Sequence, residues 1–390
     1  MQIGIDRLGL YSPHFFVDLK DLAEARGVDP NKFIIGIGQS EQAVAPSSED
    51  VVTMGANAAA EFIDDIDTSK VGLVILGTET GIDASKSGAV IIQRLLGLPE
   101  WVRTYEIKQA CYGGTAGLMT ARDYVAAHPD KTALVIAADI ARYGLNSGGE
   151  VTQGAGAVAM LISANPAIMT INDDSVFMSR DIMDFWRPVY TDLALAKGKY
   201  STEQYIKFFD DVWARYQQQT GLTLDDFAAV NFHLPYTKMG LKAFRTALPE
   251  VSEDKQTALL DAYQESTVYS RRIGNIYTGS LYLGLVSLLE NDGHVQAGDR
   301  LGMFSYGSGA VGEFFSGELQ DGFARFLHAD AHREYLDSRQ RLSVAEYERV
   351  FNNKVPYSAD DYSADPQYLS GRYVLTGVEN QERQYEERPE

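Results

Sequence analysis

The sequence predicts an α/β protein built from two similar halves. Two apolar runs, residues 71–76 and 133–138, have the composition of strands that are buried on both faces. Segments with apolar residues at helical spacing lie between the predicted strands. Residues 154–163 also resemble residues 307–316, and each stretch is predicted to be a glycine-rich turn that enters a strand. Alternating strands and helices, together with this repeat, favour a duplicated unit with parallel or mixed sheets.

The first half is predicted to span residues 1–168. Strands are expected at residues 3–10, 71–76, 101–107 and 133–138, and helices at residues 19–26, 51–62, 89–96 and 116–127. The helix at 51–62 has a clear start, because cap residues and early acids, Ser47 to Asp50, precede it.

The second half is predicted to span residues 169–390. Strands are expected at residues 227–232, 301–306 and 310–315, and helices at residues 202–219, 259–269 and 271–289. A further helix carries Lys238, Lys242 and Arg245. From residue 340 onward the chain is charged and rich in tyrosine, so we expect surface elements there and a disordered stretch over the last ten residues.

Composition excludes several classes of protein. The net charge of −20 argues against nucleic acid or anionic lipid as a partner. A single cysteine permits no internal disulfide, the first residues do not resemble a signal peptide, and no apolar run of about 18 residues is present. We therefore expect a cytoplasmic protein without a membrane span.

Cys111, the only cysteine, is predicted to lie between a strand and a helix. Unpaired N–H groups at the start of that helix would favour a thiolate, which is the form of a cysteine nucleophile. The small residues Ala110, Gly113 and Gly114 would leave room for a substrate to approach the sulfur. The alternative is a buried cysteine that acts only as a small hydrophobic side chain.

Other polar residues also stand at the ends of apolar elements, where α/β folds place ligand chemistry. These are Glu79, His233 and Asn275. Each has a simpler interpretation, respectively a solvated loop acid, a core histidine and a turn or cap residue. A phosphate-bearing ligand would need a basic patch on this acidic chain, and Lys238, Lys242 and Arg245 are the candidates, unless they form only a solvated helix face.

Five segments together resemble the hydroxymethylglutaryl-CoA synthase family. They are Gly77-Thr78-Glu79-Thr80, Gln109-Ala110-Cys111-Tyr112-Gly113-Gly114-Thr115, Asn231-Phe232-His233-Leu234-Pro235, Gly274-Asn275-Ile276-Tyr277 and Ser305-Tyr306-Gly307-Ser308-Gly309. The resemblance implies a thiolase fold, with duplicated halves in five layers (αβαβα), and a homodimer.

The resemblance also implies a mechanism. Cys111 would accept the acetyl group of acetyl-CoA as a thioester, and Glu79 would remove a proton from its methyl group. His233 and Asn275 would hold the ketone of acetoacetyl-CoA, and backbone N–H groups at Cys111 and Ser308 would stabilise the oxyanion. Water would then release (S)-3-hydroxy-3-methylglutaryl-CoA, in the mevalonate route to isoprenoids. No metal and no cofactor is implied, since the coenzyme A thioesters are substrates.

The resemblance also bears on further substrate contacts. Lys242 matches a family binding position, which favours Lys238 and Lys242 as the residues that meet the phosphates of coenzyme A. The remaining matches are Asp29, Lys32, Tyr143, Thr152, Phe185 and Ser201.

Other functions use the same residue types. A chain-initiating β-ketoacyl-acyl carrier protein synthase shares the Cys/His/Asn set, but it obtains its carbanion by decarboxylation and has no role for Glu79. A cysteine thioester hydrolase would use Cys111, His233 and Asn275 without a second acyl substrate. A thiolase needs a second cysteine, which this sequence lacks. In a non-catalytic binding module, Cys111 would be chemically inert.

Overall fold

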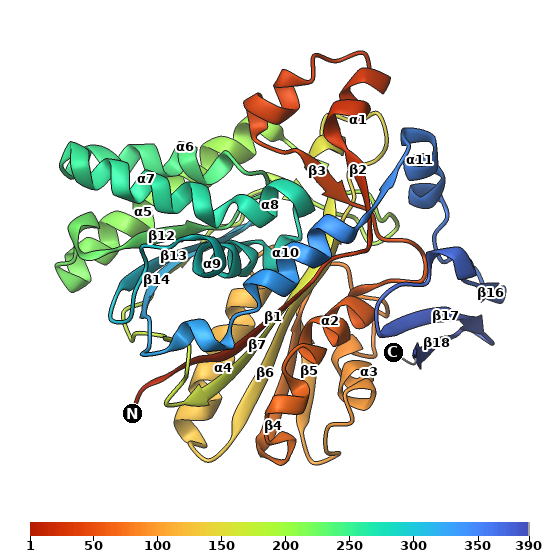
Figure 1. The fold of residues 1–390 in the computed structure, drawn as a ribbon, viewed down its shortest axis with the longest axis horizontal. Coiled ribbons are helices and arrows are strands. Elements are labelled where there is room, and N and C mark those ends of the chain that lie inside the picture. The colour runs from red at the N-terminus through yellow and green to blue at the C-terminus, as the bar shows by residue number, and fades with distance from the viewer. Residues whose placement is uncertain (389–390) are drawn as a thin grey trace.

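The computed structural model describes residues 1–388, and two mixed sheets form its centre (Figure 1). The first sheet is six-stranded, in the order β5-β4-β6-β7-β1-β8. β4 is parallel to β5 and β6, whereas β7 is antiparallel to both β6 and β1. The strands are β1 (Ile3–Tyr11), β4 (Val71–Gly77), β5 (Arg103–Ile107), β6 (Thr132–Ala141), β7 (Gly154–Ala164) and β8 (Met169–Thr170).

The second sheet has four strands, in the order β12-β13-β14-β9. They are β9 (Val176–Ser179), β12 (Ala229–Phe232), β13 (Arg300–Gly307) and β14 (Val311–Glu318). β12 and β13 are parallel, and β14 is antiparallel to β13. The order β12-β13-β14 therefore repeats that of β4-β6-β7, as expected for a duplicated unit. One local prediction is wrong: residues 154–163 lie within β7 and form no turn, whereas residues 308–310 do form a turn.

Helices pack on both faces of each sheet. α4 (Gly113–Ala127) and α9 (Ser280–Asn291) lie between the sheets, since both helices bury side chains in one core cluster with strands of both sheets. α2 (Val51–Ala60) and α3 (Gly88–Leu95) cover the outer face of the first sheet, and α5 (Gly198–Thr220) and α6 (Met239–Ala247) cover that of the second. The result is the five-layer αβαβα arrangement that the resemblance implies.

Smaller elements join these layers and complete the surface. The helices are α1 (Leu19–Ala25), α7 (Glu253–Ser266), α8 (Val268–Ile273), α10 (Ala329–Ser338) and α11 (Val344–Asn352). The short strands are β2 (Phe15–Asp18), β3 (Glu41–Ala43), β10 (Phe185–Trp186), β11 (Leu195–Ala196), β15 (Gln340–Leu342), β16 (Tyr362–Ser363), β17 (Tyr373–Glu379) and β18 (Glu382–Glu387). No helix within residues 1–388 has the length and apolar composition that crossing a membrane requires.

The C-terminal segment packs against the first half of the chain rather than lying only on the surface. In Figure 1, β17 and β18 lie beside α2 and α3. Tyr373, Leu375 and Tyr385 are buried in the same core cluster as α2. The prediction of surface elements was therefore wrong for these residues, because β17 is mostly apolar and buried, and β18 buries Tyr385 among its charged residues. The predicted disorder of the last ten residues is also wrong for β18, and residues 389–390 lie outside the described range.

A buried histidine connects α10 to both halves. His332 Nε2 lies 3.0 Å from Glu61 Oε1, and its Nδ1 lies 2.8 Å from Glu290 Oε2. Burial alone would lower the pKa of His332, but hydrogen bonds to the two carboxylates raise it to about 10. His332 is therefore a cation at neutral pH that joins Glu61, next to α2, to Glu290 on α9.

Candidate active site

Four strands of the two sheets point their carboxyl ends toward one region. Glu79 follows β4, Asp139 lies near the end of β6, His233 follows β12 and Ser308 follows β13. Cys111 lies between the end of β5 and the start of α4, as predicted for a strand-to-helix junction. The carboxyl ends of parallel strands are where α/β folds place ligand chemistry.

Cys111 and Glu79 are in contact. The Cys111 Sγ donates a hydrogen bond to Glu79 Oε1 at 3.5 Å. Burial raises the pKa of the Cys111 thiol well above its usual range, and the nearby charges of Glu79 and Asp139 raise it further. The prediction of a resting thiolate was therefore wrong: these effects outweigh the N-terminus of α4. Glu79 is placed to accept the thiol proton when the sulfur attacks.

The glycines after Cys111 bring α4 close to the second half of the chain. A Cβ on Gly114 would lie 2.5 Å from the carbonyl oxygen of Thr278, and a Cβ on Gly113 would lie 3.1 Å from that of Ile107. Both glycines are buried. The expectation that they leave room for substrate is thus incorrect, because backbone atoms occupy that space.

Asp139, which the sequence analysis missed, fixes the turn that carries Glu79. Its Oδ1 accepts hydrogen bonds from Thr78 Oγ1 at 2.9 Å and from the backbone N–H groups of Glu79 and Thr80 at 2.9 and 3.0 Å. Its Oδ2 accepts hydrogen bonds from Thr278 N at 3.1 Å and Thr278 Oγ1 at 2.6 Å. One buried carboxylate therefore ties β4, β6 and the approach to α9 together. An acid at the end of an apolar strand was the available signal, the same one that identified Glu79.

Burial also sets the protonation of Glu79. The side chain is 8% exposed. Desolvation raises the pKa of Glu79 to about 8, the charge of Asp139 adds to this shift, and the charge of Arg187 opposes it. A carboxyl group with this pKa can both accept and return a proton near neutral pH.

His233 points toward the start of α4. Phe232 pairs with Phe304 in parallel register, so His233 is level with Ser305, and its backbone N–H donates to Phe304 O at 2.8 Å. Side chains in register point to the same face of a sheet. Ser305 Oγ bonds to Thr115 Oγ1 at 2.8 Å, in the first turn of α4. His233 therefore faces the helix that follows Cys111.

The imidazole of His233 is neutral and incompletely paired. Burial lowers the pKa of His233 to about 3. Its Nδ1 is buried and has no hydrogen-bond partner within residues 1–388. A buried polar atom of this kind is suited to a ligand that brings its own polar group.

Aromatic rings form one wall around Cys111. The Tyr143 ring lies 6.0 Å from that of Phe185 and 6.2 Å from that of Tyr277, both edge to face. Cys111 and Tyr143 pack against the small apolar cluster that contains Phe185 and Tyr277. Asn275 Oδ1 accepts a hydrogen bond from Tyr277 N at 2.9 Å, while its buried Nδ2 has no partner in the described part of the chain.

The turn that carries Ser308 lies against the Cys111 loop. A Cβ on Gly307 would be 2.6 Å from Tyr112 N and 2.7 Å from Gln109 O. Glycine is therefore required for this close approach. It places Ser308, the next residue, beside the loop that holds Cys111.

A second acid that the sequence analysis missed organises this side of the site. Asp184 Oδ2 accepts hydrogen bonds from Tyr306 Oη at 2.7 Å and Ser201 Oγ at 3.3 Å, and Oδ1 accepts one from Gly309 N at 2.9 Å. Asp184 directly precedes Phe185. The structure therefore brings Ser201 and the turn after β13 to the same acid.

The predicted basic residues form a rim at the start of α6. Lys238 caps this helix, and its backbone N–H donates to Ile37 O at 3.2 Å, at the end of the short helix Lys32–Ile37. Lys242 Nζ donates to Tyr236 Oη at 2.7 Å and is exposed. The contact with Ile37 joins the helix that begins at Lys32, in the first half, to the start of α6, in the second half.

The structure does not join two other predicted contacts to Cys111. Asp29 is exposed, and its Oδ1 accepts a hydrogen bond from Asn31 N at 3.0 Å. Thr152 donates to Gly149 O at 2.9 Å within its own loop. Their roles in substrate binding remain predictions. No group of His, Cys, Asp and Glu side chains within residues 1–388 is arranged to hold a metal ion.

Comparison with known proteins identifies relatives over the whole chain. Residues 1–167 match the family model of the hydroxymethylglutaryl-coenzyme A synthase N terminal, and residues 250–388 match that of the C terminal. The chain is 49% identical to a hydroxymethylglutaryl-CoA synthase of Enterococcus faecalis over 385 residues, which cover 99% of this chain and 100% of the relative.

Solved structures agree. A crystal structure of an HMG-CoA synthase complexed with CoA is similar with a TM-score of 0.97 and 44% identity, covering 100% of both chains. MvaS in complex with 3-hydroxy-3-methylglutaryl coenzyme A is similar with a TM-score of 0.87 and 37% identity, covering 99% of both chains.

Proposed function

This chain belongs to the hydroxymethylglutaryl-CoA synthase family, and from that premise we propose how its own residues carry out the family's reaction. The protein is an acyltransferase that condenses acetyl-CoA with acetoacetyl-CoA and water, giving (S)-3-hydroxy-3-methylglutaryl-CoA and free CoA, the reaction of the mevalonate route. The observation that carries the proposed roles is the contact between Cys111 Sγ and Glu79 Oε1 at 3.5 Å.

In the first step Cys111 takes the acetyl group. The sulfur attacks the thioester carbonyl of acetyl-CoA as its proton passes to Glu79, and CoA leaves with a proton. This coupling is needed because burial raises the pKa of the thiol. Backbone N–H groups of Cys111 and Ser308 stabilise the oxyanion, since the turn at Gly307 lies against the Cys111 loop. The aromatic wall of Tyr143, Phe185 and Tyr277 excludes water from the thioester.

In the second step Glu79 removes a proton from the acetyl methyl group. The pKa of about 8 allows the carboxylate to take this proton near neutral pH. The carboxylate of Asp139 holds the turn of Glu79 in place, because it accepts a hydrogen bond from the backbone N–H of Glu79. No decarboxylation is needed, which distinguishes this reaction from that of a ketoacyl synthase.

In the third step the enolate attacks the ketone of acetoacetyl-CoA. A hydrogen bond from neutral His233 polarises the ketone oxygen, with the unpaired Nδ2 of Asn275 as a second donor. The new alkoxide takes the proton that Glu79 removed from the methyl group. Water then cleaves the thioester, so that the product gains the carboxyl group and the Cys111 sulfur regains a proton. Unpaired buried polar atoms at both residues support this assignment.

The phosphates of coenzyme A bind at the basic rim. Lys238 and Lys242 supply positive charge on a protein whose net charge is −20. Lys32 adds a cation from the facing helix, and Asp29 and Thr152 are further contacts proposed on resemblance alone. Coenzyme A thioesters enter as substrates, and we propose no metal or other cofactor.

We propose that the protein is a homodimer that works in the cytoplasm. Each chain consists of two halves, and the boundary between them lies near residue 168. β5 forms the edge of the six-stranded sheet, and Trp101 beside it is 96% exposed. An open strand edge next to an exposed aromatic ring is a surface that a second copy can cover. Sedimentation equilibrium tests this: a monomer at micromolar concentration would exclude the dimer.

One cysteine, without a disulfide, fits a reducing compartment such as the cytoplasm.

The decisive experiment compares wild type with Glu79→Gln, which keeps the volume of the side chain but removes the base. Each protein is incubated with acetyl-CoA, the acetyl mass on the Cys111 peptide is measured, and acetoacetyl-CoA is then added. We expect Glu79→Gln to acquire the acetyl group, more slowly than wild type, and to form no hydroxymethylglutaryl-CoA.

Two results would contradict the proposed roles. If Glu79→Gln formed product at the wild-type rate, Glu79 would not be the base. If wild type accepted acetyl groups only from a carrier protein, or condensed only malonyl groups, its substrates would differ from those proposed. Cys111→Ser is the control for the site of acetylation.

A further inference from the structure

The loop of residues 142–153 holds Tyr143 beside Cys111, and two of its own side chains shape it. Gln153 Oε1 accepts hydrogen bonds from Tyr143 N at 2.7 Å and Gly144 N at 3.0 Å. Glu150 Oε2 accepts one from Asn146 N at 2.9 Å. Both side chains are almost completely buried. The backbone that leads out of Tyr143 therefore depends on where these two side chains are held.

A single phenol of α11 contacts both of them. Gln153 Nε2 donates to Tyr347 Oη at 2.9 Å, and Tyr347 Oη lies 3.2 Å from Glu150 Oε1, to which it donates. Glu150 is also paired with Arg26, whose Nε and Nη2 donate to its two oxygens at 2.9 and 2.7 Å. Tyr347 is thus the shared partner of the two residues that shape the loop.

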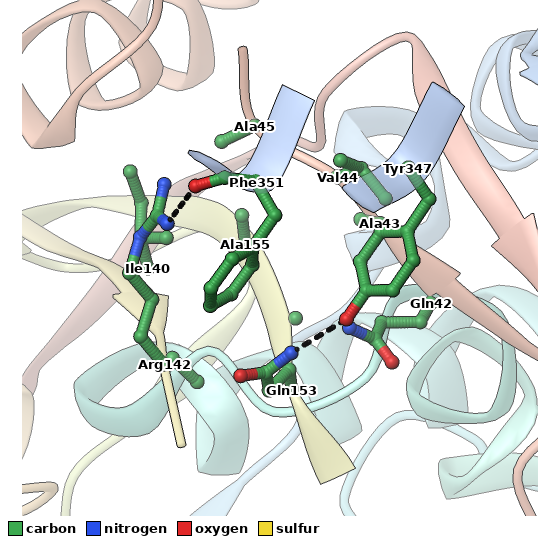
Figure 2. Close-up of a pocket in the computed structure, with 12 residues that line it drawn as sticks. Gln42, Ala43, Val44, Ala45, Ile140, Arg142, Gln153, Ala155, Tyr347 and Phe351 are labelled. Carbon is green, nitrogen blue, oxygen red and sulfur yellow. Dashed lines mark hydrogen bonds between the residues drawn. The ribbon is translucent and has the colours of Figure 1, made fainter. Parts of the chain in front are cut away.

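The other end of the loop is attached to the same helix. Arg142 Nη1 donates to Phe351 O at 2.8 Å, and its guanidinium lies 4.6 Å from the centre of the Phe351 ring. Tyr347 and Phe351 are four residues apart in α11, so they share one face of the helix. Figure 2 shows both hydrogen bonds, from Arg142 to Phe351 and from Gln153 to Tyr347.

Apolar contacts add to these bonds, because Leu145 and Val151 of the loop pack against the core cluster that contains Tyr347. A cavity lies between α11 and the strands β6 and β7, lined by Ile140, Ala155, Gln153, Tyr347 and Phe351 among others (Figure 2). Four alanines, Ala43, Ala45, Ala141 and Ala155, are among the residues that line it. Where the ends of the loop border this space, their position depends on the polar contacts, so the loss of these contacts allows a shift there.

We propose that α11 clamps both ends of the loop of residues 142–153, and that Tyr347 is a positioning residue that keeps Tyr143 against Cys111. The proposal rests on the proposed function, because Tyr143 matters only if Cys111 carries the acetyl group. It assigns the C-terminal segment a part in acetyl transfer, although α11 does not contact the sulfur. A small displacement of a pocket wall is enough to slow a reaction that depends on orientation.

The test is Tyr347→Phe, with Tyr385→Phe as the matched control. Both tyrosines lie in the C-terminal segment, and each phenol donates to a buried carboxylate, Glu150 for Tyr347 and Asp50 for Tyr385. Tyr385 has no bond to the loop. Three quantities are measured for each full-length variant: the urea midpoint, the amide hydrogen exchange of the peptide that contains residues 142–153, and the rate of Cys111 acetylation.

We expect Tyr347→Phe to speed exchange at Tyr143 and Gly144 by roughly tenfold, because the loss of one hydrogen bond frees Gln153. The rate of acetylation should fall by about tenfold. Tyr385→Phe should lower the urea midpoint but change neither exchange in the loop nor acetylation.

If loop exchange and the acetylation rate changed equally in Tyr347→Phe and Tyr385→Phe, or changed in neither, the proposal that α11 clamps the loop would be overturned. If Tyr347→Phe does not fold, Arg142→Lys tests the other end of the loop with the same readouts. If wild type is not acetylated at all, the proposed function fails, but the exchange measurement still decides whether α11 holds the loop.

Discussion

The protonation of Glu79 predicts how deprotonation of the acetyl group depends on pH. Burial and the charge of Asp139 raise the pKa of Glu79 to about 8. With this value, about one carboxyl group in eleven is ionised at pH 7 and about ten in eleven at pH 9. If the ionised form is the base, the rate of proton removal rises by about tenfold between these pH values. Acetylation removes the thiol hydrogen bond that lowers this pKa, so the midpoint should lie at or above pH 8.

Exchange of the acetyl protons with deuterium oxide measures this step alone. The protein is first acetylated on Cys111, then transferred to deuterated buffer without acetoacetyl-CoA, and the mass of the Cys111 peptide is followed with time. Each exchanged proton adds about one mass unit. The measured exchange rate should rise from pH 7 to pH 9 as Glu79 ionises.

Two variants make the result specific. Glu79→Gln should show no exchange above background at any pH. Glu49→Gln is the matched control, because Glu49 is also buried and has a pKa raised to about 7, yet it bonds to Tyr11 and Ser370 away from the site. A flat profile in wild type, or exchange at the wild-type rate in Glu79→Gln, would refute the role of Glu79 as base.

Other consequences can be measured separately. The pKa of His332 is raised above its ordinary 6.5 to about 10, so its contribution to stability is complete below pH 6.5 and is lost as pH rises through 10. In urea titrations the difference in unfolding free energy between wild type and His332→Gln should shrink by up to about 1.4 kcal/mol per pH unit in that window, and a constant difference would contradict a charged His332. Alanine at both Lys238 and Lys242 should raise the KM for acetyl-CoA about tenfold at low salt with kcat unchanged, and an unchanged KM would exclude the basic rim. Asp139→Asn should move the midpoint of methyl exchange to lower pH, because a negative charge near the base is removed, and an upward shift would contradict this.

The α/β class was predicted correctly from local sequence, and the resemblance to a known family correctly implied the five-layer fold. The apolar runs of β4 and β6 were identified because a strand buried on both faces is apolar throughout. Glu79 and His233 were selected because each polar residue directly ends such a run. The same rule applied to Asp139 would have identified the acid that organises the site, so this residue was missed although its signal was present.

The C-terminal segment shows where local pattern fails. Tyr347 lies among charged residues in α11, and this composition predicted a surface element. The structure buries one face of α11, because Tyr347 and Val350 pack against the sheet of β2 and β15. Residues nearly 200 positions away supply its hydrogen-bond partners, Glu150 and Gln153. No periodicity within the helix contains that information.

The sequence by itself determined the elements, their order and the residue types that stand at strand ends, because these follow from spacing within short segments. Only the tertiary structure decided which of these residues meet and in which charge state. Cys111 illustrates the difference: its position at a helix start predicted a thiolate, whereas burial beside Glu79 and Asp139 favours the thiol. A pKa depends on every charge and on all solvent excluded around a group, and those are contributed by parts of the chain that only folding brings together.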